Sequence, residues 1–191
     1  MILLSDHRAK AHPQFALFDT PIGPCGLVWG ARGLVGVLLP EAGAAATRAV
    51  AQRRFGGAQE AEAPPDVRQV MARIVSLLSG EPDSLLDIEL DTSAVPEFNL
   101  RVYELSRGIL PGQTLTYGEV ALRLGEPHAA RAVGQALGAN PFPISVPCHR
   151  VLAAGNKSGG FSAPGGARTK LRLLEIEGAP LGAGPGLFDS A

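Results

Sequence analysis

The residues best suited to covalent chemistry lie in the segment "PISVPCHRV", residues 143–151. Cys148 stands between a proline and His149, and Arg150 follows. A thiolate is a strong nucleophile, and a nearby base or fixed cation favours the thiolate over the thiol. The prolines restrict the backbone and reduce the entropy lost in holding one loop shape. The segment therefore suits a nucleophile, although a buried thiol that only fills space fits the same residues.

A nucleophilic Cys148 would need help from its surroundings. Neighbouring side chains on an extended segment point to opposite faces, so Cys148 and His149 must be joined by a bend or a bridging water. An imidazole that acts as a base also needs a group that orients it, and Glu175 and Glu177 near the C-terminus are candidates. These residues alone leave the choice between filler and nucleophile open.

Two other uses of cysteine are less well supported. Cys25 has no titratable neighbour in sequence, which is typical of an inert buried thiol. A zinc site would need closely spaced ligands, but there is no C-x₂-C pair. The histidines are scattered along the chain, at His7, His12, His128 and His149. We therefore expect no bound metal.

Length and composition predict a globular protein. The chain has 191 residues, 46% of them hydrophobic, which is enough for one compact unit or two small domains. The net charge of -1 argues against a protein that coats nucleic acid or membrane through overall charge. Residues 1–94 carry 8 basic and 11 acidic side chains, whereas residues 95–178 carry 9 and 6. The second half is thus the better candidate for binding an anion.

The location follows from hydropathy and cysteine usage. No apolar run approaches the roughly 18 residues that span a bilayer, and the charges near the N-terminus follow the short apolar stretch, which is the wrong order for a secretion signal. Two cysteines that stand far apart are typical of free thiols in a reducing compartment. We expect a cytoplasmic protein without a membrane partner.

The first half alternates strand and helix patterns. Three β-prone runs separated by Gly/Pro turns predict a small antiparallel meander: residues 15–20, 26–29 and 34–39. Residues 44–55 and 66–80 have helical spacing, and 85–91 read as one more short strand. The sequence pattern changes from mixed strands and helices to mainly helices near Ser93, where we place a domain boundary.

The second half is mainly helical. Residues 96–108 predict a helix, and 116–125 and 127–140 predict two short ones. Gly125 would close the first of this pair and Pro127 would open the second. The pair suggests a helix-turn-helix, although any two packed helices give the same pattern.

A last helix is predicted over residues 167–178, with Leu171, Leu174 and Ile176 facing inward. The Gly/Pro-rich stretch after it reads as a loose tail. We therefore expect an N-terminal domain, a second domain that carries the chemistry, and a tail: residues 1–93, 94–178 and 179–191.

Four ordered blocks resemble the O6-alkylguanine-DNA alkyltransferase family: "LPGQTLTYGEVA", "GEPHAARAVGQALGANP", "ISVPCHRVLAAGNKSGGFS" and "KLRLLEIEG". The resemblance covers residues 98–178, and only "TPIG" is similar in the N-terminal half. It implies an α/β N-terminal domain with a small antiparallel sheet, and a mostly α-helical C-terminal domain with a helix-turn-helix and the reactive cysteine.

The resemblance also implies an activity. An alkyl group passes from O6-alkylguanine in double-stranded DNA to Cys148, after the damaged nucleotide has been rotated out of the duplex. A thioether is a poor leaving group, so each molecule reacts once. The chemistry requires no cofactor, and we expect a monomer.

By the same resemblance, Cys148 accepts the alkyl group and His149 draws off its proton through a water. Glu177 orients His149, whereas Glu175 faces solvent. The hydroxyl of Tyr117 donates to the leaving base, although a buried core tyrosine is the competing interpretation.

On the DNA side, the resemblance places Arg131 in the vacated base stack. Ala129, Ala130 and Ala132 let the helix approach the floor of the minor groove, although alanines that only pack inward fit the same pattern.

Asn140 is expected to tie the turn between this helix and the active-site loop. Backbone groups near Cys148 and Val151, and an amide at Ser162, are expected to read guanine. The chain departs from the family at Phe161, where many members have tyrosine. The following "SAPGG" is two residues longer than the short glycine turn that those members have at this point.

Three rival functions follow from the same residues. A family member that binds the lesion without removing it would lack the cysteine, which is present here. A regulator that senses alkylation would carry a further DNA-binding pattern or a metal-binding cysteine cluster, and the sequence has neither. A cysteine hydrolase built on Cys148 and His149 would show repeated turnover.

Overall fold

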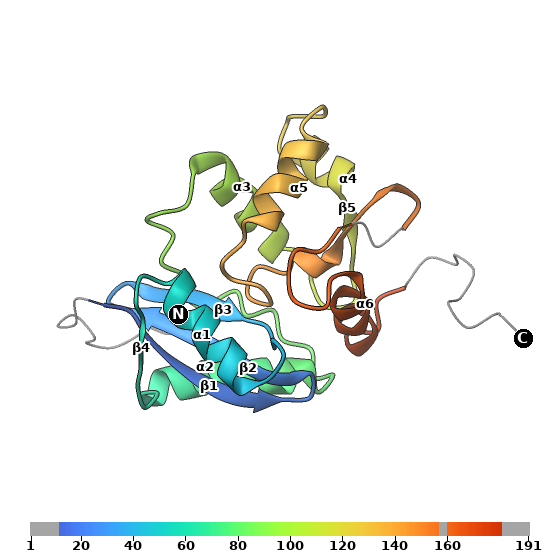
Figure 1. The fold of residues 1–191 in the computed structure, drawn as a ribbon. Helices are drawn as coiled ribbons and strands as arrows, with labels where there is room; N and C mark the ends of the chain where they lie inside the picture. Colours follow the sequence, from blue (N-terminus) through green and yellow to red (C-terminus); the bar gives the residue numbers. More distant parts are fainter. Residues whose placement is uncertain (1–11, 157–159, 181–191) are drawn as a thin grey trace, which may run out of the picture.

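The computed structural model describes residues 12–156 and 160–180 (Figure 1). Its main sheet has the strand order β3-β2-β1-β4. The first three strands are antiparallel neighbours joined by tight turns: β1 (Gln14–Thr20), β2 (Gly23–Gly30) and β3 (Gly33–Leu38). The predicted meander is confirmed. The sheet is mixed, however, because β4 (Gln59–Glu60) pairs parallel to β1 and is too short to leave an alternating pattern.

Two helices cover the two faces of this sheet, α1 (Ala44–Arg54) and α2 (Pro65–Leu78). Strand β2 is buried on both sides because its alternate side chains enter different hydrophobic clusters. Leu27 and Trp29 pack in the cluster on the α2 side, whereas Val28 packs in the cluster on the α1 side. We call the cluster on the α2 side the sheet core.

The strand predicted over residues 85–91 is wrong. Leu90 forms an isolated bridge with Leu34 of β3, and no strand covers residues 85–91 in the part of the chain that the structure describes. The backbone turns at residues 86–87, next to Leu85, which has a φ of 53°. Arg73 on α2 holds this turn, because it pairs with the carboxylates of Asp83 and Asp87 at 2.8 Å. In place of the predicted strand, this segment thus forms a turn that is held by ion pairs.

Three helices form the upper part of the molecule in Figure 1: α3 (Glu97–Arg107), α4 (Tyr117–Arg123) and α5 (Ala130–Gly138). Helix α5 packs against both others, which confirms the predicted helix pair. Gly125 follows α4 with a φ of 77°, and its N–H bonds to the carbonyl of Leu122, as expected of a glycine stop. Pro127, however, does not open α5, because residues 127–128 form a separate turn first.

A second, two-stranded sheet joins the helix pair to the active-site segment. Strand β5 (Leu115–Thr116) pairs parallel to β6 (Val151–Leu152). Two short 3₁₀ turns flank β6, η1 (Cys148–Arg150) and η2 (Ala154–Asn156). The cysteine segment is therefore hydrogen-bonded, through β6, to the chain that leads directly into α4.

The last helix, α6 (Ala167–Ile176), is confirmed, and Leu174 is buried as expected, but the rest of its buried side differs from the prediction. Lys170, Leu173 and Leu174 are buried, whereas Leu171 and Ile176, which we expected inside, are only half-buried. The reason is that α6 contacts two cores. Leu173 enters the sheet core and Leu174 packs in a small cluster with Leu152 and Ala179.

A separate cluster, the helical core, is built around α3, α4 and α5. The fold class is therefore that expected, an α/β part with a small sheet and a mostly helical part with a helix-turn-helix. The boundary at Ser93 and the tail from 179 remain predictions, and the tail beyond residue 180 lies outside the described residues. Within the described ranges, no helix is long and apolar enough to cross a membrane.

Candidate active site

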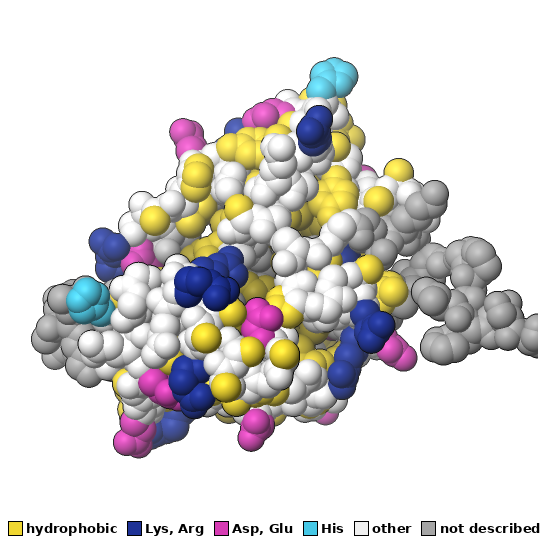
Figure 2. All heavy atoms as spheres, viewed as in Figure 1, with side chains coloured by type: hydrophobic (Ala, Val, Ile, Leu, Met, Phe, Trp, Pro, Cys, Tyr) yellow, Lys and Arg dark blue, Asp and Glu magenta, His cyan; other side chains and the backbone are white. Residues whose placement is uncertain are grey.

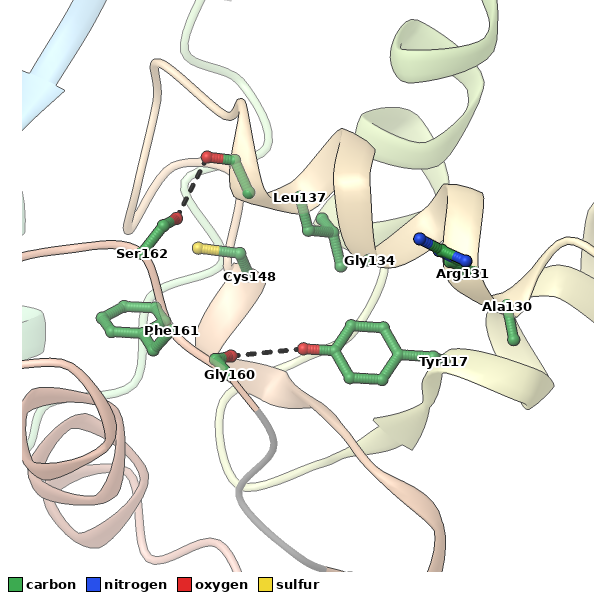
Figure 3. A pocket seen from close by; sticks show the side chains of 10 residues that line it. Tyr117, Ala130, Arg131, Gly134, Leu137, Cys148, Gly160, Phe161 and Ser162 are labelled. Carbon is green, nitrogen blue, oxygen red and sulfur yellow. Dashed lines mark hydrogen bonds between the residues drawn. The ribbon is translucent and has the colours of Figure 1, made fainter.

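Local capping sets the position of Tyr117. Thr116 and Glu119 form a reciprocal capping box, in which the Thr116 side chain accepts from the N–H of Glu119 and the Glu119 carboxylate accepts from the N–H of Thr116. This fixes where α4 starts. Tyr117 is therefore the first residue of the helix, directly after β5, and its ring turns toward the cysteine segment (Figure 3).

The chain between α5 and Cys148 is held by Asn140. The side-chain oxygen of Asn140 accepts from the N–H of Phe142 at 2.8 Å, and its amide donates to the carbonyl of Val146 at 2.9 Å. Asn140 is buried, so both bonds are shielded from water. The turn that Asn140 was expected to tie is closed in this way, and it leads directly to Cys148.

Cys148 lies on the wall of a cavity of about 570 Å³ (Figure 3). The cavity is bounded by α5, by Tyr117 and by residues 160–162, and the thiol points from η1 toward Ser162. The hydroxyl of Tyr117 donates to the carbonyl of Gly160 at 3.4 Å. A flat ring-shaped ligand entering past α5 would thus meet a tyrosine and a thiol.

A second cavity of about 290 Å³ also reaches Cys148, from the side of α1 and β3. Phe161 lines both cavities and packs, half-buried, against the sheet core and the helical core. The long "SAPGG" loop after it is closed by Thr169, whose hydroxyl donates to the carbonyl of Pro164 at 2.7 Å. Phe161 therefore separates two spaces that meet at the thiol.

Three charged or titratable side chains form a buried cluster, and two of them, His149 and Arg150, follow Cys148 directly in the chain. Nε2 of His149 lies 2.9 Å from Oε1 of Glu177. Arg150 donates to both carboxylate oxygens of Glu177, at 2.8 and 2.9 Å, and to the carbonyl of Ile109. All three side chains are at least 96% buried. The helix end at Glu177 is thus joined to the segment that carries Cys148.

The protonation of this cluster follows from its contacts. Burial alone would raise the pKa of the Glu177 carboxyl, but its bonds to His149 and Arg150 lower it to about 2. Burial lowers the pKa of His149 more than Glu177 raises it. A neutral imidazole beside a carboxylate donates from Nε2, which leaves Nδ1 as an acceptor. Nδ1 is buried and has no hydrogen-bond partner among the residues that the structure describes, so it can take a proton.

Among the described residues, Lys170 is a cation whose charge acts on the pKa of the Cys148 thiol. The sequence pattern did not single out this residue. Burial raises the pKa of the Cys148 thiol, and the Asn140 side chain and the positive charge of Lys170 oppose this. Lys170 is fully buried, donates to the carbonyl of Val151 at 2.6 Å, and lies over the ring of Tyr117. Burial lowers its own pKa to about 8.

Arg150, which we expected to favour the Cys148 thiolate, is instead occupied by Glu177. Lys170 lies in an amphipathic helix, so the sequence gives no indication that it acts on the thiol. Its role becomes visible only in the structure, where α6 packs on η1.

The other expected residues fall into two groups. Ala130, Arg131 and Ser162 line the larger cavity, with Arg131 exposed on α5 and the Ser162 hydroxyl bonded to the carbonyl of Gly138 at 3.0 Å. Ala129 and Val151 do not line either cavity at Cys148.

Ala129 and Ala130 are both half-buried and pack against the helical core. This agrees with the competing interpretation, in which these alanines pack inward. Val151 is buried and its carbonyl bonds to Lys170. Glu175 is exposed, as expected, and cannot replace Glu177.

On the face in Figure 2, Lys and Arg side chains are dispersed among Asp and Glu side chains and form no single basic patch. Within residues 12–156 and 160–180, no group of three or more His, Cys, Asp and Glu side chains is placed to hold a metal ion. The other cysteine, Cys25, is a buried free thiol in the sheet core, where burial raises its pKa to about 11.

Comparison with known proteins agrees with this geometry. Residues 97–179 match the family described as 6-O-methylguanine DNA methyltransferase, DNA binding domain. The methylated-DNA-protein-cysteine methyltransferase of Methanothermobacter thermautotrophicus is 32% identical over 180 residues, which are 94% of this chain and 93% of that protein.

Solved structures give the same answer. The crystal structure of Mycobacterium tuberculosis OGT in complex with DNA matches with a TM-score of 0.69 at 32% identity, over 87% of this chain and 95% of that one. The O6-methylguanine-DNA methyltransferase of Pyrococcus kodakaraensis matches with a TM-score of 0.66 at 27% identity, over 87% and 100%. The resemblance seen in the sequence is confirmed, and the chain belongs to the family of methylated-DNA-protein-cysteine methyltransferases.

Proposed function

We propose that the protein repairs DNA by moving an alkyl group from O6-alkylguanine in duplex DNA to Cys148. The observation that carries this proposal is the thiol on the wall of an open cavity, followed directly in the chain by His149, whose ring contacts the buried carboxylate of Glu177. The names of its relatives, and the DNA bound to one of them, support the same function.

The first step is loss of the thiol proton. Burial keeps Cys148 protonated at neutral pH, so a base is needed at the moment of reaction. The free Nδ1 of His149 takes the proton through a bridging water, and the resulting imidazolium is stabilised by the ionised Glu177. The positive charge of Lys170 favours the thiolate that forms.

The second step is displacement at carbon. The sulfur forms a bond to the alkyl carbon while the bond from carbon to O6 breaks, and the electron pair of that bond goes to the guanine. The leaving base becomes an anion unless it receives a proton. Burial raises the pKa of Tyr117, so its hydroxyl stays protonated and donates to the leaving base in place of the Gly160 carbonyl.

The DNA approaches along α5. The damaged base must leave the stack to reach a thiol on a cavity wall, and unstacking costs a few kcal/mol. Arg131 at the cavity mouth, on the exposed side of α5, fills the vacated place, because a guanidinium both stacks and attracts phosphate. Ala130 allows close approach of the helix, and the amide of Ser162 reads the base from residues 160–162.

The product is a thioether, which has no ordinary route back to the thiol, so each molecule acts once. We further propose that the protein works as a monomer in the cytoplasm, where two free thiols remain reduced. The domain division at Ser93 belongs to this proposal, with residues 94–178 carrying both DNA contact and chemistry.

The test is to incubate the protein with duplex DNA that contains O6-methylguanine, and to measure protein mass and base repair. The expected result is one added methyl on Cys148, at most one per molecule, and none in Cys148→Ala. The matched control is Cys25→Ala, which should react normally because Cys25 lies in the sheet core. Repeated turnover, or tight binding without transfer, would refute the proposal.

A further inference from the structure

The segment that leads to Cys148 contains a residue in an unusual backbone conformation. Ile144 has a φ of 75°, in the left-handed region that β-branched residues rarely adopt. Such a residue is unfavourable by roughly 1–3 kcal/mol and persists only where its surroundings hold it. Backbone strain of this kind is concentrated at functional sites, which makes the surroundings of Ile144 informative.

The conformation has a clear consequence for packing. In an extended segment, Phe142, Ile144 and Val146 would share one face, but residues 143–145 form a turn. Phe142 and Val146 do pack in the helical core, but Ile144 packs in the sheet core and is only 2% exposed. The turn that contains the left-handed Ile144 thus directs this side chain away from Phe142 and Val146 and places it among the residues of β2, β3 and α2.

Two hydrogen bonds to backbone carbonyls, one from a backbone N–H and one from a side chain, support this insertion at the start of the segment. The N–H of Val37 on β3 donates to the carbonyl of Pro141 at 2.9 Å. Arg54 at the end of α1 donates to the carbonyl of Asn140 at 3.1 Å. The sheet part therefore holds the segment at its first residues and again at Ile144.

The other end of the segment leads to the nucleophile. Val146 donates to the carbonyl of Phe142 at 2.7 Å, and Cys148 donates to the carbonyl of Val146 at 2.8 Å. The chain from Ile144 to the thiol is thus short and hydrogen-bonded. We therefore expect a change in the backbone conformation at Ile144 to move Cys148 as well.

We propose that Ile144 is a positioning residue for alkyl transfer, which uses the sheet core to hold the Cys148 segment in a strained, reactive geometry. This inference rests on the proposed function and assigns the N-terminal part a role in the reaction itself. Ile144 contacts neither the base nor the alkyl group in the proposed reaction. It acts through the backbone that it anchors.

The test compares three variants in single-turnover methyl transfer from O6-methylguanine DNA. Ile144→Ala removes the anchor but keeps the penalty for a left-handed backbone, so the segment relaxes and transfer slows by about 10²-fold. Ile144→Gly removes the anchor and also the penalty, so it keeps part of the reactive geometry and is faster than Ile144→Ala. Loss of packing alone predicts the opposite order, because glycine removes more of the side chain.

The matched control is Ile74→Ala on α2, which deletes the same atoms from the same core away from the Cys148 segment. It should lower the melting temperature as Ile144→Ala does and leave the transfer rate within about twofold of the original protein. Transfer by Ile144→Ala as fast as by Ile74→Ala, or transfer by Ile144→Gly slower than by Ile144→Ala, would overturn the proposal.

A second measurement separates this proposal from the proposed function. The rate at which iodoacetamide labels Cys148 is measured against pH, with mass spectrometry to exclude Cys25. The pH midpoint should shift in Ile144→Ala and stay unchanged in Ile74→Ala, even if the DNA substrate proves to be a different one. Equal midpoints in both variants would refute the positioning role, whereas failure of the original protein to accept methyl would refute only the proposed function.

Discussion

Replacing Glu177 by glutamine should weaken both the fold and the reaction, because Glu177 is the only carboxylate found in contact with His149 and Arg150 among the described residues. The ionised side chain has a pKa lowered from 4.5 to about 2 and is 4% exposed, so solvent screens it little. Each pKa unit is worth about 1.4 kcal/mol, so ionised Glu177 contributes roughly 3 kcal/mol to stability at pH 7.

The pH dependence gives this prediction its sign. A carboxyl whose pKa is lower in the folded state stabilises the protein above the unfolded pKa, and the stabilisation disappears as the pH falls toward the folded pKa. The difference in unfolding free energy between the original protein and Glu177→Gln should therefore be about 3 kcal/mol or more at pH 7 and about 1.5 kcal/mol at pH 3. Urea unfolding at both pH values measures it.

The natural control is Glu175→Gln, which makes the same change on an exposed side chain of the same helix. It should alter stability by less than about 0.5 kcal/mol. Glu177→Gln should also slow methyl transfer by about 10²-fold, because a glutamine amide no longer stabilises the imidazolium. A loss of stability that is the same at pH 3 and pH 7, or no larger than that of Glu175→Gln, would refute the reasoning.

Two further predictions concern residues outside this cluster. Lys170→Met should raise the pKa of the Cys148 thiol and move the pH profile of methyl transfer to higher pH. The free energy of unfolding in urea should change by less than about 1 kcal/mol, since a buried ammonium is replaced by an apolar chain of similar size. An unchanged pH profile would exclude the role of Lys170. Gly36→Ala should lower the melting temperature and cost about 1–3 kcal/mol, because a new Cβ would lie 2.3 Å from the ring of Phe55, and stability equal to the original would contradict this packing.

The sequence predicted those features that depend on local pattern. Helical spacing with a glycine stop placed α2 and α4 within a few residues, and alternation with Gly/Pro turns placed the meander. The resemblance singled out Cys148, His149 and Glu177, and the structure brings the last two within hydrogen-bond distance.

Features that depend on distant partners were missed. Strands β5 and β6 have two residues each, so neither leaves an alternating pattern, and their pairing joins residues far apart in the chain. Lys170 looks like an ordinary surface residue of a helix until α6 is packed on η1. The inward side of α6 was predicted correctly only at Leu174, since the pattern of one helix does not reveal that Leu173 enters a core built by other elements.

The place of Leu173 also has a consequence for how the chain folds as it is made. The sheet core consists mostly of residues from the first half of the chain, yet it is completed by Ile144 and Leu173. Chains are synthesised from the N-terminus, and a domain folds as a unit once its parts have emerged. The core of the half that is made first is therefore complete only after α6 has been made.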